Sequence, residues 1–468
     1  MTFSTLVRFA CGPFIVAALG LISVPLMAWI FPPNVIGQIA MFNIFLSGCT
    51  LVLTLGFDQA YVREYHEVNN KEVLFKSLFS TSLVIVCLFC LGIIIFHDVT
   101  VNILFDEKQN TLWIATGIAV AVVFSIFYRF SSLILRMKEQ GIKYSLLQVS
   151  AKLFLVVGLL GLLLVDNKPS FFSAFVLSCF ALVFAGVTAF MLNKKECALA
   201  YRSKLNKEQI QRAMKFGFPL VISGFIYWGL ISVDRWAIRY FSGLDDLGLY
   251  SVAFSFAAVM TIFQQVFSTV WAPIVYQWNK KGVDILQLNL ITDWVVIILS
   301  TVFVIVSILS PLLTLFLPEA YAEVVYLLPA CMLYPVFYTL SETTVVGMNI
   351  ARKTNYSIVV TLFPLLLNIL LCYILIPLYG AGGAAVAVAT SFYLYLIIRT
   401  EISKHVWRSF NSSKLYVVSA LLLLTAMVPA LTKLDNLWPS NIVLLLIVFF
   451  VYWRRFRSMK LDLITLMK

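Results

Sequence analysis

Eight ionisable residues lie within or directly beside long apolar runs, where a charge is costly unless it faces a protein interior or a watery cavity. The clearest run is Phe216–Val233, 18 residues without a charge, which is followed at once by Asp234 and Arg235. Residues of this kind are candidates for a functional site. The cations are Arg129, Lys152, Arg235 and Arg239, and the acids are Asp58, Asp234, Asp293 and Glu342.

The four cations favour an anionic cargo. Arginine forms two parallel hydrogen bonds with a phosphate, and lysine offers a compact point charge. We therefore assign Arg129, Lys152, Arg235 and Arg239 as candidate substrate-binding residues. Arg129 and Lys152 give the stronger indication of a cavity, because an unpaired cation in lipid is so costly.

The four acids are candidates for binding a coupling proton or sodium ion, and the sequence selects none of them. Two alternatives remain open. Asp234 and Arg235 alternatively form a structural pair that neutralises charge within the membrane. Asp293 and Glu342 lie near the inner ends of their predicted helices and alternatively extend into the lipid head groups.

Uncharged polar residues form stripes along the same runs, since positions i, i+4, i+7 and i+11 share one face of a helix. Several helices with one polar face each predict a water-accessible cavity, whose hydroxyl and amide groups suit a sugar. The alternative is hydrogen bonding between helices. The stripes are Asn43, Ser47, Thr50, Thr54 and Asp58; Ser125, Arg129, Ser132 and Arg136; Ser145, Gln148 and Lys152; Ser223, Tyr227 and Asp234; and Tyr334, Tyr338, Ser341 and Glu342.

The elements that position these residues are transmembrane helices. With 61% hydrophobic and 12% charged residues, the composition is that of an all-α polytopic membrane protein. Apolar runs bounded by charges and turn residues predict about fourteen spans. They lie near 10–31, 36–57, 77–97, 111–131, 145–165, 171–192, 216–240, 248–275, 289–317, 324–347, 357–378, 381–398, 415–432 and 440–453.

The two halves of the chain echo each other. Leu21-Ile22-Ser23-Val24 recurs as Leu230-Ile231-Ser232-Val233, and nearby Pro and Gly residues keep nearly the same spacing. This predicts two pseudo-symmetric six-helix lobes, at 1–192 and 216–398. A polar linker at 193–215 joins them, either as a helix on the membrane surface or as a solvated segment, and a terminal helix pair with a basic tail follows at 399–468.

The distribution of basic residues predicts the orientation. If both ends are cytoplasmic, 28 of the 34 Lys and Arg residues fall in inner segments and 5 in outer segments. The formal net charge of +12 is therefore assigned to the membrane topology and not to nucleic-acid binding.

Motifs for enzymatic chemistry are not found. The chain has no phosphate-binding Gly-Lys loop, no nucleophile elbow and no zinc motif, and the predicted outer connections are too short for a catalytic domain. Cys87-x-x-Cys90 lies in an apolar run and is interpreted as two buried side chains. We expect no enzymatic activity, no cofactor and no metal.

The ordered motifs resemble the Wzx-type polysaccharide flippases of the multidrug/oligosaccharidyl-lipid/polysaccharide exporter superfamily. The resemblance covers about residues 1–400. The residues that carry it are Gly56-Phe57-Asp58-Gln59-Ala60, Arg63-Glu64, Lys215-Phe216-Gly217, Pro219, Ser232-Val233-Asp234-Arg235-Trp236, Leu247-Gly248-Leu249-Tyr250, Ala253, Arg352-Lys353-Thr354, Asn368, Ile376-Pro377-Leu378-Tyr379-Gly380 and Gly383-Ala384-Ala385.

The resemblance implies that a central cavity between the lobes opens alternately to either side. It implies that the cargo is an oligosaccharide linked to undecaprenyl diphosphate. This cargo would move from the cytoplasmic to the periplasmic leaflet of a bacterial inner membrane, for O-antigen, lipopolysaccharide or capsule synthesis. A polysaccharide polymerase and a chain-length regulator are the implied functional partners.

Three other functions are weighed against this interpretation. A multidrug exporter of the same superfamily usually carries cations and would favour acidic cavity residues. A lipid II flippase shares the anionic cargo and the span count. A membrane sugar polymerase or ligase would need a large outer loop for its active site, and the sequence contains none.

Overall fold

The computed structural model describes residues 3–164, 170–281, 285–351, 353, 356–407, 410–434, 438–453, 455 and 457, and the regular elements in these ranges are all helices. The all-α prediction is therefore confirmed. Twelve helices within the described residues are long and apolar enough to cross a membrane. The chain is a multi-pass membrane protein, and it divides into two compact units, Met1–Trp228 (unit 1) and Gly229–Lys468 (unit 2).

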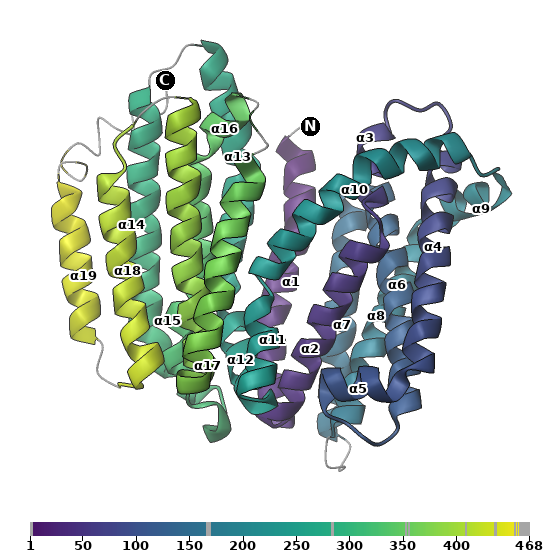
Figure 1. Ribbon diagram of the computed structural model, residues 1–468, viewed down its shortest axis with the longest axis horizontal. Helices are drawn as coiled ribbons and strands as arrows, with labels where there is room; N and C mark the ends of the chain where they lie inside the picture. The colour runs from purple at the N-terminus through teal and green to yellow at the C-terminus, as the bar shows by residue number, and fades with distance from the viewer. Residues whose placement is uncertain are drawn as a thin grey trace. The chain divides into compact units, whose positions relative to one another are not determined.

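Unit 1 contains the first nine helices and almost all of the tenth (Figure 1). They are α1 (Phe3–Ile30), α2 (Pro33–Leu53), α3 (Phe57–Glu64), α4 (Lys71–Ile95), α5 (His97–Phe105), α6 (Thr111–Met137), α7 (Gly141–Leu164), α8 (Phe171–Leu192), α9 (Lys194–Arg202) and α10 (Lys207–Leu230). The predicted linker, 193–215, forms α9 and the first part of α10. Lys138, which directly follows α6, holds α9 through an ion pair with Glu196.

Unit 2 contains the remaining helices. They are α11 (Val233–Phe241), α12 (Leu244–Ala257), α13 (Val259–Lys281), α14 (Ile285–Leu309), the 3₁₀ turns η1 (Ser310–Leu315) and η2 (Glu319–Tyr321), α15 (Val324–Thr344), α16 (Val346–Ile350), α17 (Tyr356–Val406), α18 (Ser413–Thr432) and α19 (Trp438–Val451). The predicted terminal pair corresponds to α18 and α19. Helix α18 packs on α15 and α17, and α19 packs on α14.

The helix α17 accounts for two predicted spans, 357–378 and 381–398. It is 51 residues long and contains a break at Gly380, whose φ of 53° and ψ of −130° are not helical. A Cβ at this position would lie 2.1 Å from a carboxylate oxygen of Asp246, so glycine is required by both the backbone and the space.

Two other predicted spans are interrupted. The span at 216–240 breaks into α10 and α11 at residues 231–232, and the span at 248–275 breaks into α12 and α13 at Ala258. At the first break the amide of Asn368 on α17 donates a hydrogen bond of 3.1 Å to the carbonyl oxygen of Leu230. The side chain thereby satisfies an acceptor that the end of α10 leaves open.

Each unit shows the same set of contacts between helices at corresponding places along its chain. In unit 1 the pairs α1–α7, α4–α6, α2–α6 and α6–α8 are in contact. In unit 2 the pairs α11–α17, α14–α15, α12–α15 and α15–α17 are in contact. The two units therefore share this set of contacts between helices. The echoed segment differs in one respect, because Leu21–Val24 lies in the continuous helix α1 whereas Leu230–Val233 lies at the break between α10 and α11.

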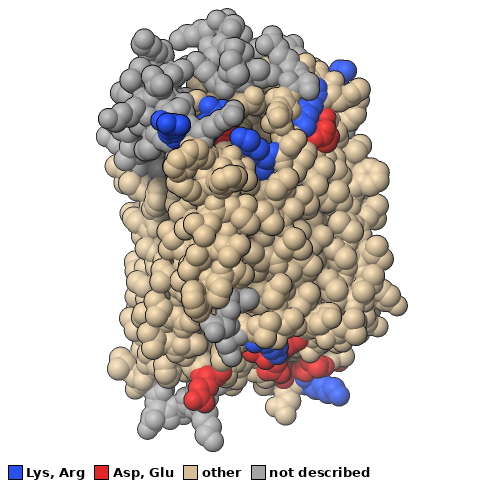
Figure 2. Space-filling view, turned by 90° about the vertical axis from the view of Figure 1, so that its left-hand side faces the viewer, with Lys and Arg blue, Asp and Glu red and all other residues tan. Residues whose placement is uncertain are grey.

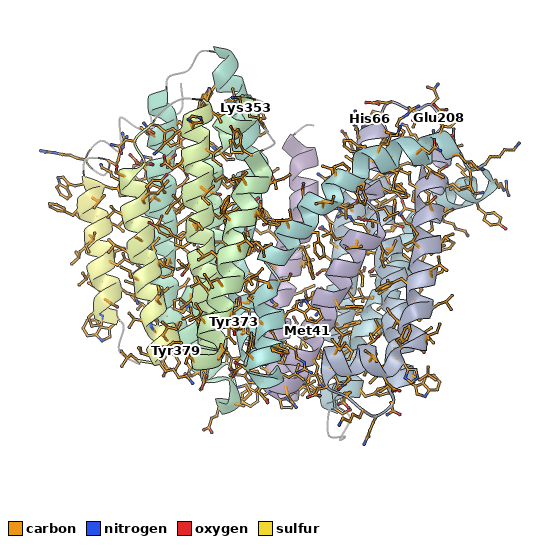
Figure 3. The ribbon with its side chains drawn as sticks, in the orientation of Figure 1. Met41, His66, Glu208, Lys353, Tyr373 and Tyr379 are labelled. Carbon is orange, nitrogen blue, oxygen red and sulfur yellow. The ribbon has the colours of Figure 1, made fainter. Side chains whose placement is uncertain are left out.

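The surface is divided into apolar and charged zones. Figure 2 shows the face that carries α19, where a broad band without charge separates acidic and basic side chains at the two ends. Large apolar side chains of α19, such as Phe450, are exposed, which is the surface expected of a protein that lipid surrounds. In unit 2, Lys353 and Tyr379 lie near opposite ends of the helices (Figure 3).

Candidate substrate-binding site

A cleft of about 500 Å³ opens in unit 1 between α2, α3, α6 and α10. It contains one cation and one acid that the sequence singled out, together with hydroxyl, amide and apolar groups. The lining residues are Ser47, Thr50, Leu51, Gly56, Asp58, Gln59, Arg129, Leu220, Val221 and Gly224.

Asp58 and Arg129 form an ion pair at the cleft. The Nη2 and Nε atoms of Arg129 donate hydrogen bonds of 2.7 and 3.1 Å to the same carboxylate oxygen, Oδ2 of Asp58. The Asp58 side chain is only 10% exposed, whereas that of Arg129 is 41% exposed. The acid therefore anchors the guanidinium from the protein side, and part of the guanidinium remains open to a ligand in the cleft.

The backbone around Gly56 places Asp58 at this position. Leu55 and Gly56 have positive φ values of 52° and 71°. These backbone conformations separate the end of α2 from the start of α3. Asp58 then lies in the first turn of α3, where the helix dipole stabilises a negative charge. A Cβ on Gly56 would lie 2.5 Å from the carbonyl oxygen of Gly217, so two glycines allow α10 to cross the start of α3 closely.

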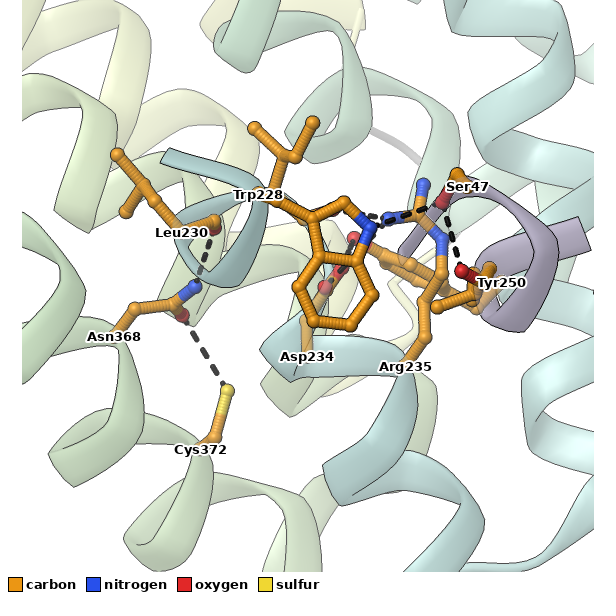
Figure 4. A network of polar contacts seen from close by, with 10 residues as sticks. Ser47, Trp228, Leu230, Asp234, Arg235, Tyr250, Asn368 and Cys372 are labelled. Carbon is orange, nitrogen blue, oxygen red and sulfur yellow. Dashed lines mark hydrogen bonds and ion pairs between the residues drawn. The ribbon is translucent and has the colours of Figure 1, made fainter. Parts of the chain in front are cut away.

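The polar stripes of α2 and α6 meet at this cleft. Thr50 and Ser125 share a hydrogen bond of 3.2 Å between their hydroxyl groups. Ser47 accepts a hydrogen bond of 2.9 Å from the indole N–H of Trp228, a contact drawn in Figure 4. The stripes thus contribute both to a cavity and to contacts between helices. Trp228 was not singled out from the sequence, because a tryptophan in an apolar run has no distinctive spacing.

The stripe of α7 faces α1 and does not line the cleft. Ser145 Oγ accepts a hydrogen bond of 3.1 Å from the backbone N–H of Gly12. Further along α7, the Cε atom of Lys152 lies 4.0 Å from the position of a Cβ on Gly20. Lys152 is partly exposed and makes no ion pair within the described part of the chain.

Asp234 and Arg235 form a pair inside unit 2 (Figure 4). The Nη1 atom of Arg235 lies 3.6 Å from Oδ1 of Asp234, and both side chains are largely buried. The hydroxyl of Tyr250 donates a hydrogen bond of 2.5 Å to the other carboxylate oxygen. The guanidinium also lies over the ring of Phe254, 4.1 Å from its centroid. This is the geometry of the structural pair that the sequence left open.

The remaining candidates lie elsewhere in unit 2. Glu342 and Arg399 form a largely buried ion pair of 2.7 Å between α15 and α17. Asp293 on α14 pairs with Arg455 at 2.8 Å. Arg239 lies one turn beyond Arg235 on α11 and is partly exposed.

The structure thus joins four of the eight candidates in pairs, Asp58 with Arg129 and Asp234 with Arg235, and it pairs Glu342 and Asp293 with arginines outside the set. The sequence interpretation missed Arg399 and Arg455 as partners because it counted them with the inner loops. A signal for the Glu342–Arg399 pair was present in the sequence, because these opposite charges lie at the inner ends of two predicted helices. Within the described residues no three His, Cys, Asp or Glu side chains are placed to hold a metal ion.

Comparisons with known proteins fit this architecture. Residues 9–278 match the family described as "Polysaccharide biosynthesis protein". The "Probable low-salt glycan biosynthesis flippase Agl15" of Haloferax volcanii is 23% identical over 231 residues, which are 48% of this chain and 47% of that protein. The match therefore spans about half the length of this curated relative.

Solved structures share the fold over most of the chain. The lipid II flippase MurJ, in an inward closed conformation, has a TM-score of 0.73 at 15% identity, and the alignment covers 97% of this chain and 99% of that one. An inward-facing multidrug resistance MATE family transporter has a TM-score of 0.65 at 13% identity, covering 86% of this chain and 97% of that one.

Proposed function

The chain belongs to the polysaccharide biosynthesis protein family, and on that premise we propose that it is a flippase of the Wzx type. Its cargo is an oligosaccharide repeat unit linked to undecaprenyl diphosphate, which moves from the cytoplasmic to the periplasmic leaflet by alternating access. The product serves O-antigen or capsule synthesis. The observation that carries this proposal is the half-exposed guanidinium of Arg129 in the polar cleft of unit 1.

The cleft suits the head of such a cargo. The diphosphate accepts charged hydrogen bonds from Arg129, and the hydroxyl and amide groups of Ser47, Thr50 and Gln59 suit the first sugar. A cleft of about 500 Å³ has the volume of an ordinary small-ligand site, which fits a head group and not a whole oligosaccharide. Lys152 is proposed as a second cation along the path of the cargo.

Asp58 and the diphosphate compete for the same guanidinium. Binding of the cargo therefore weakens the ion pair between Asp58 and Arg129. We propose Asp58 as the acid that binds a coupling proton or sodium ion, because among the four candidate acids it is the one that lines the cleft. Asp234 and Arg235 are assigned a structural role, because both are buried against each other and against aromatic rings.

The proposed location is the bacterial inner membrane with both termini in the cytoplasm, as the distribution of Lys and Arg predicts. A polymerase and a chain-length regulator are the proposed functional partners. The biochemical role proposed here is transport without covalent chemistry.

The proposal is tested with variants of α6 in a strain that lacks the chromosomal copy. Arg129→Ala should lower translocation about tenfold to a hundredfold, the effect of removing a charged hydrogen bond. Arg136→Ala is the matched control, since Arg136 is exposed on the same helix and lies outside the cleft. Equal translocation by the two variants at equal protein level would contradict the site.

Because Arg129→Ala leaves the nearly buried Asp58 without its partner, a second variant separates transport from stability. The double variant Asp58→Asn/Arg129→Gln keeps both shapes and removes both charges. It should accumulate in the membrane like the parent and still fail to translocate the cargo.

A lipid II flippase is the second candidate. The solved MurJ structure aligns over 97% of this chain. Essentiality distinguishes the two functions, because a flippase for a cell-wall precursor is indispensable. A viable deletion strain with intact cell wall and lost surface polymer supports the polysaccharide cargo.

A further inference from the structure

A second cavity, of about 250 Å³, lies in unit 2 at the end of the helices where α18 and α19 meet α14, η1 and α15. It is separate from the cleft of unit 1 and contains no residue that the proposed function uses. Its lining side chains carry no charge and include Ser307, Ser310, Tyr326, Thr425 and Asn441.

Two buried polar groups in this cavity have unused hydrogen-bonding capacity. Ser307 is 8% exposed, and its hydroxyl has no hydrogen-bonding partner among the described residues. Asn441 is 5% exposed, and its amide makes no hydrogen bond with the described part of the chain. Burying the Ser307 hydroxyl without a partner is costly, and a polar ligand in the cavity would satisfy both this hydroxyl and the Asn441 amide.

Prolines add acceptors to the same wall. Pro329 lies within α15 and Pro429 within α18, and a proline inside a helix deprives the carbonyl four residues earlier of its N–H partner. Those carbonyls belong to Val325 and Thr425, and both residues line the cavity. The lining thus includes two residues whose helical carbonyls lack this N–H partner, together with the hydroxyl of Ser307, which can both donate and accept.

Aromatic residues complete the cavity. Trp438 begins α19 and is 56% exposed, and Tyr326 lies in the first turn of α15. Flat apolar rings beside uncharged donors and acceptors match a ligand that has an apolar C–H face and hydroxyl groups around its edge. A phosphate does not match, because no lining side chain is cationic. A lipid tail would leave Ser307 and Asn441 unpaired.

We propose that this cavity is a binding site for one neutral pyranose ring. An ion pair between Glu323 and Lys433 joins the start of α15 to the end of α18 beside it, which holds two walls together. In the proposed orientation the site lies at the periplasmic end of unit 2. This proposal rests on the proposed function in one respect only, which is that the sugar comes from the glycan of the translocated cargo.

The experiment measures binding of free sugars to the full chain in lipid nanodiscs, by saturation-transfer NMR. The probes are methyl β-glucoside and methyl β-N-acetylglucosaminide, and glycerol is the probe for a polyol without a ring, such as a lipid head group. Saturation of the ring protons is expected with at least one glycoside. No transfer to either glycoside, or equal transfer to glycerol, would overturn the proposal.

Variants localise the signal. Asn441→Leu should weaken glycoside binding about tenfold, as loss of hydrogen bonds from one buried amide predicts, and Trp438→Ala should weaken it as well. Trp453→Ala is the control, since Trp453 is also an exposed tryptophan of the terminal segment and lies outside the cavity. Unchanged binding by Asn441→Leu and Trp438→Ala would assign the signal to another place and overturn the site.

The test is independent of translocation. If Arg129→Ala translocates normally but the glycoside binds at Asn441, the proposed cleft of unit 1 fails and the sugar site stands. If translocation depends on Arg129 but no glycoside binds, the sugar site fails alone.

Discussion

Replacing Asp58 by Asn should tighten the binding of inorganic diphosphate to the cleft of unit 1. In the parent protein the carboxylate occupies Nε and Nη2 of Arg129 at 3.1 and 2.7 Å, so an anionic ligand must displace it. Asparagine keeps the shape but removes the competing charge.

The magnitude follows from Coulomb's law and the exposure of the pair. Two unit charges about 4 Å apart interact by about 1 kcal/mol in water and about 4 kcal/mol at the effective dielectric constant of a protein surface. Arg129 is 41% exposed, which places the pair toward the lower value. A gain of about 1–2 kcal/mol corresponds to about 5- to 30-fold tighter binding.

Isothermal titration of nanodisc-embedded protein with diphosphate measures this directly. The gain should shrink as salt is raised, because the charges are partly screened. Arg129→Gln should lose binding in either background. Weaker binding by Asp58→Asn than by the parent would refute the competition and assign Asp58 the task of holding Arg129 in a binding geometry.

Three further outcomes are expected. Gly56→Ala should destabilise the protein by about 1–3 kcal/mol in thermal unfolding, because it strains a positive φ and a backbone contact, whereas Gly92→Ala should not, since nothing lies within 4 Å of its Cβ. Arg399→Met should cost about 3–5 kcal/mol by leaving Glu342 charged and unpaired, and adding Glu342→Gln should restore most of the folded protein seen by size-exclusion chromatography. Partial burial acts to raise the pKa of the Glu196 carboxyl. The hydrogen bond and the charge of Lys138 act in the opposite direction and are stronger, so the pKa lies below its ordinary value. The contact that holds α9 should therefore be present above the ordinary carboxyl pKa and be lost as the pH falls through the lowered one, which hydrogen exchange of α9 would detect.

Hydropathy was sufficient to predict the long membrane-spanning helices, because lipid requires about twenty apolar residues per span and every backbone hydrogen bond must be made within the protein. It did not predict the short helices α3 and α5. The breaks at 231–232 and at Ala258 were not predicted, since both lie within apolar runs. The first is stabilised by Asn368, which is more than a hundred residues away in sequence, and no local pattern carries that information.

The candidate site was likewise predicted only in part. Residue type and helical spacing selected Asp58 and Arg129, and both lie at one cleft. The same criteria also selected Arg235, although its charge is enclosed by Asp234, Tyr250 and Phe254. Sequence shows that a cation lies in the membrane, but only the packing shows whether water or an aromatic ring surrounds it.

The central claim is tested most directly by the location of the lipid-linked sugar in a strain whose only copy carries Asp58→Asn/Arg129→Gln. Access of a membrane-impermeant glycan-labelling reagent to the undecaprenyl-linked repeat unit, in inside-out and right-side-out vesicles, reports the leaflet. We expect single repeat units to accumulate on the cytoplasmic face, with surface polymer lost and the protein present at the parental level. Normal surface polymer without such accumulation, in the absence of a second flippase, would contradict it.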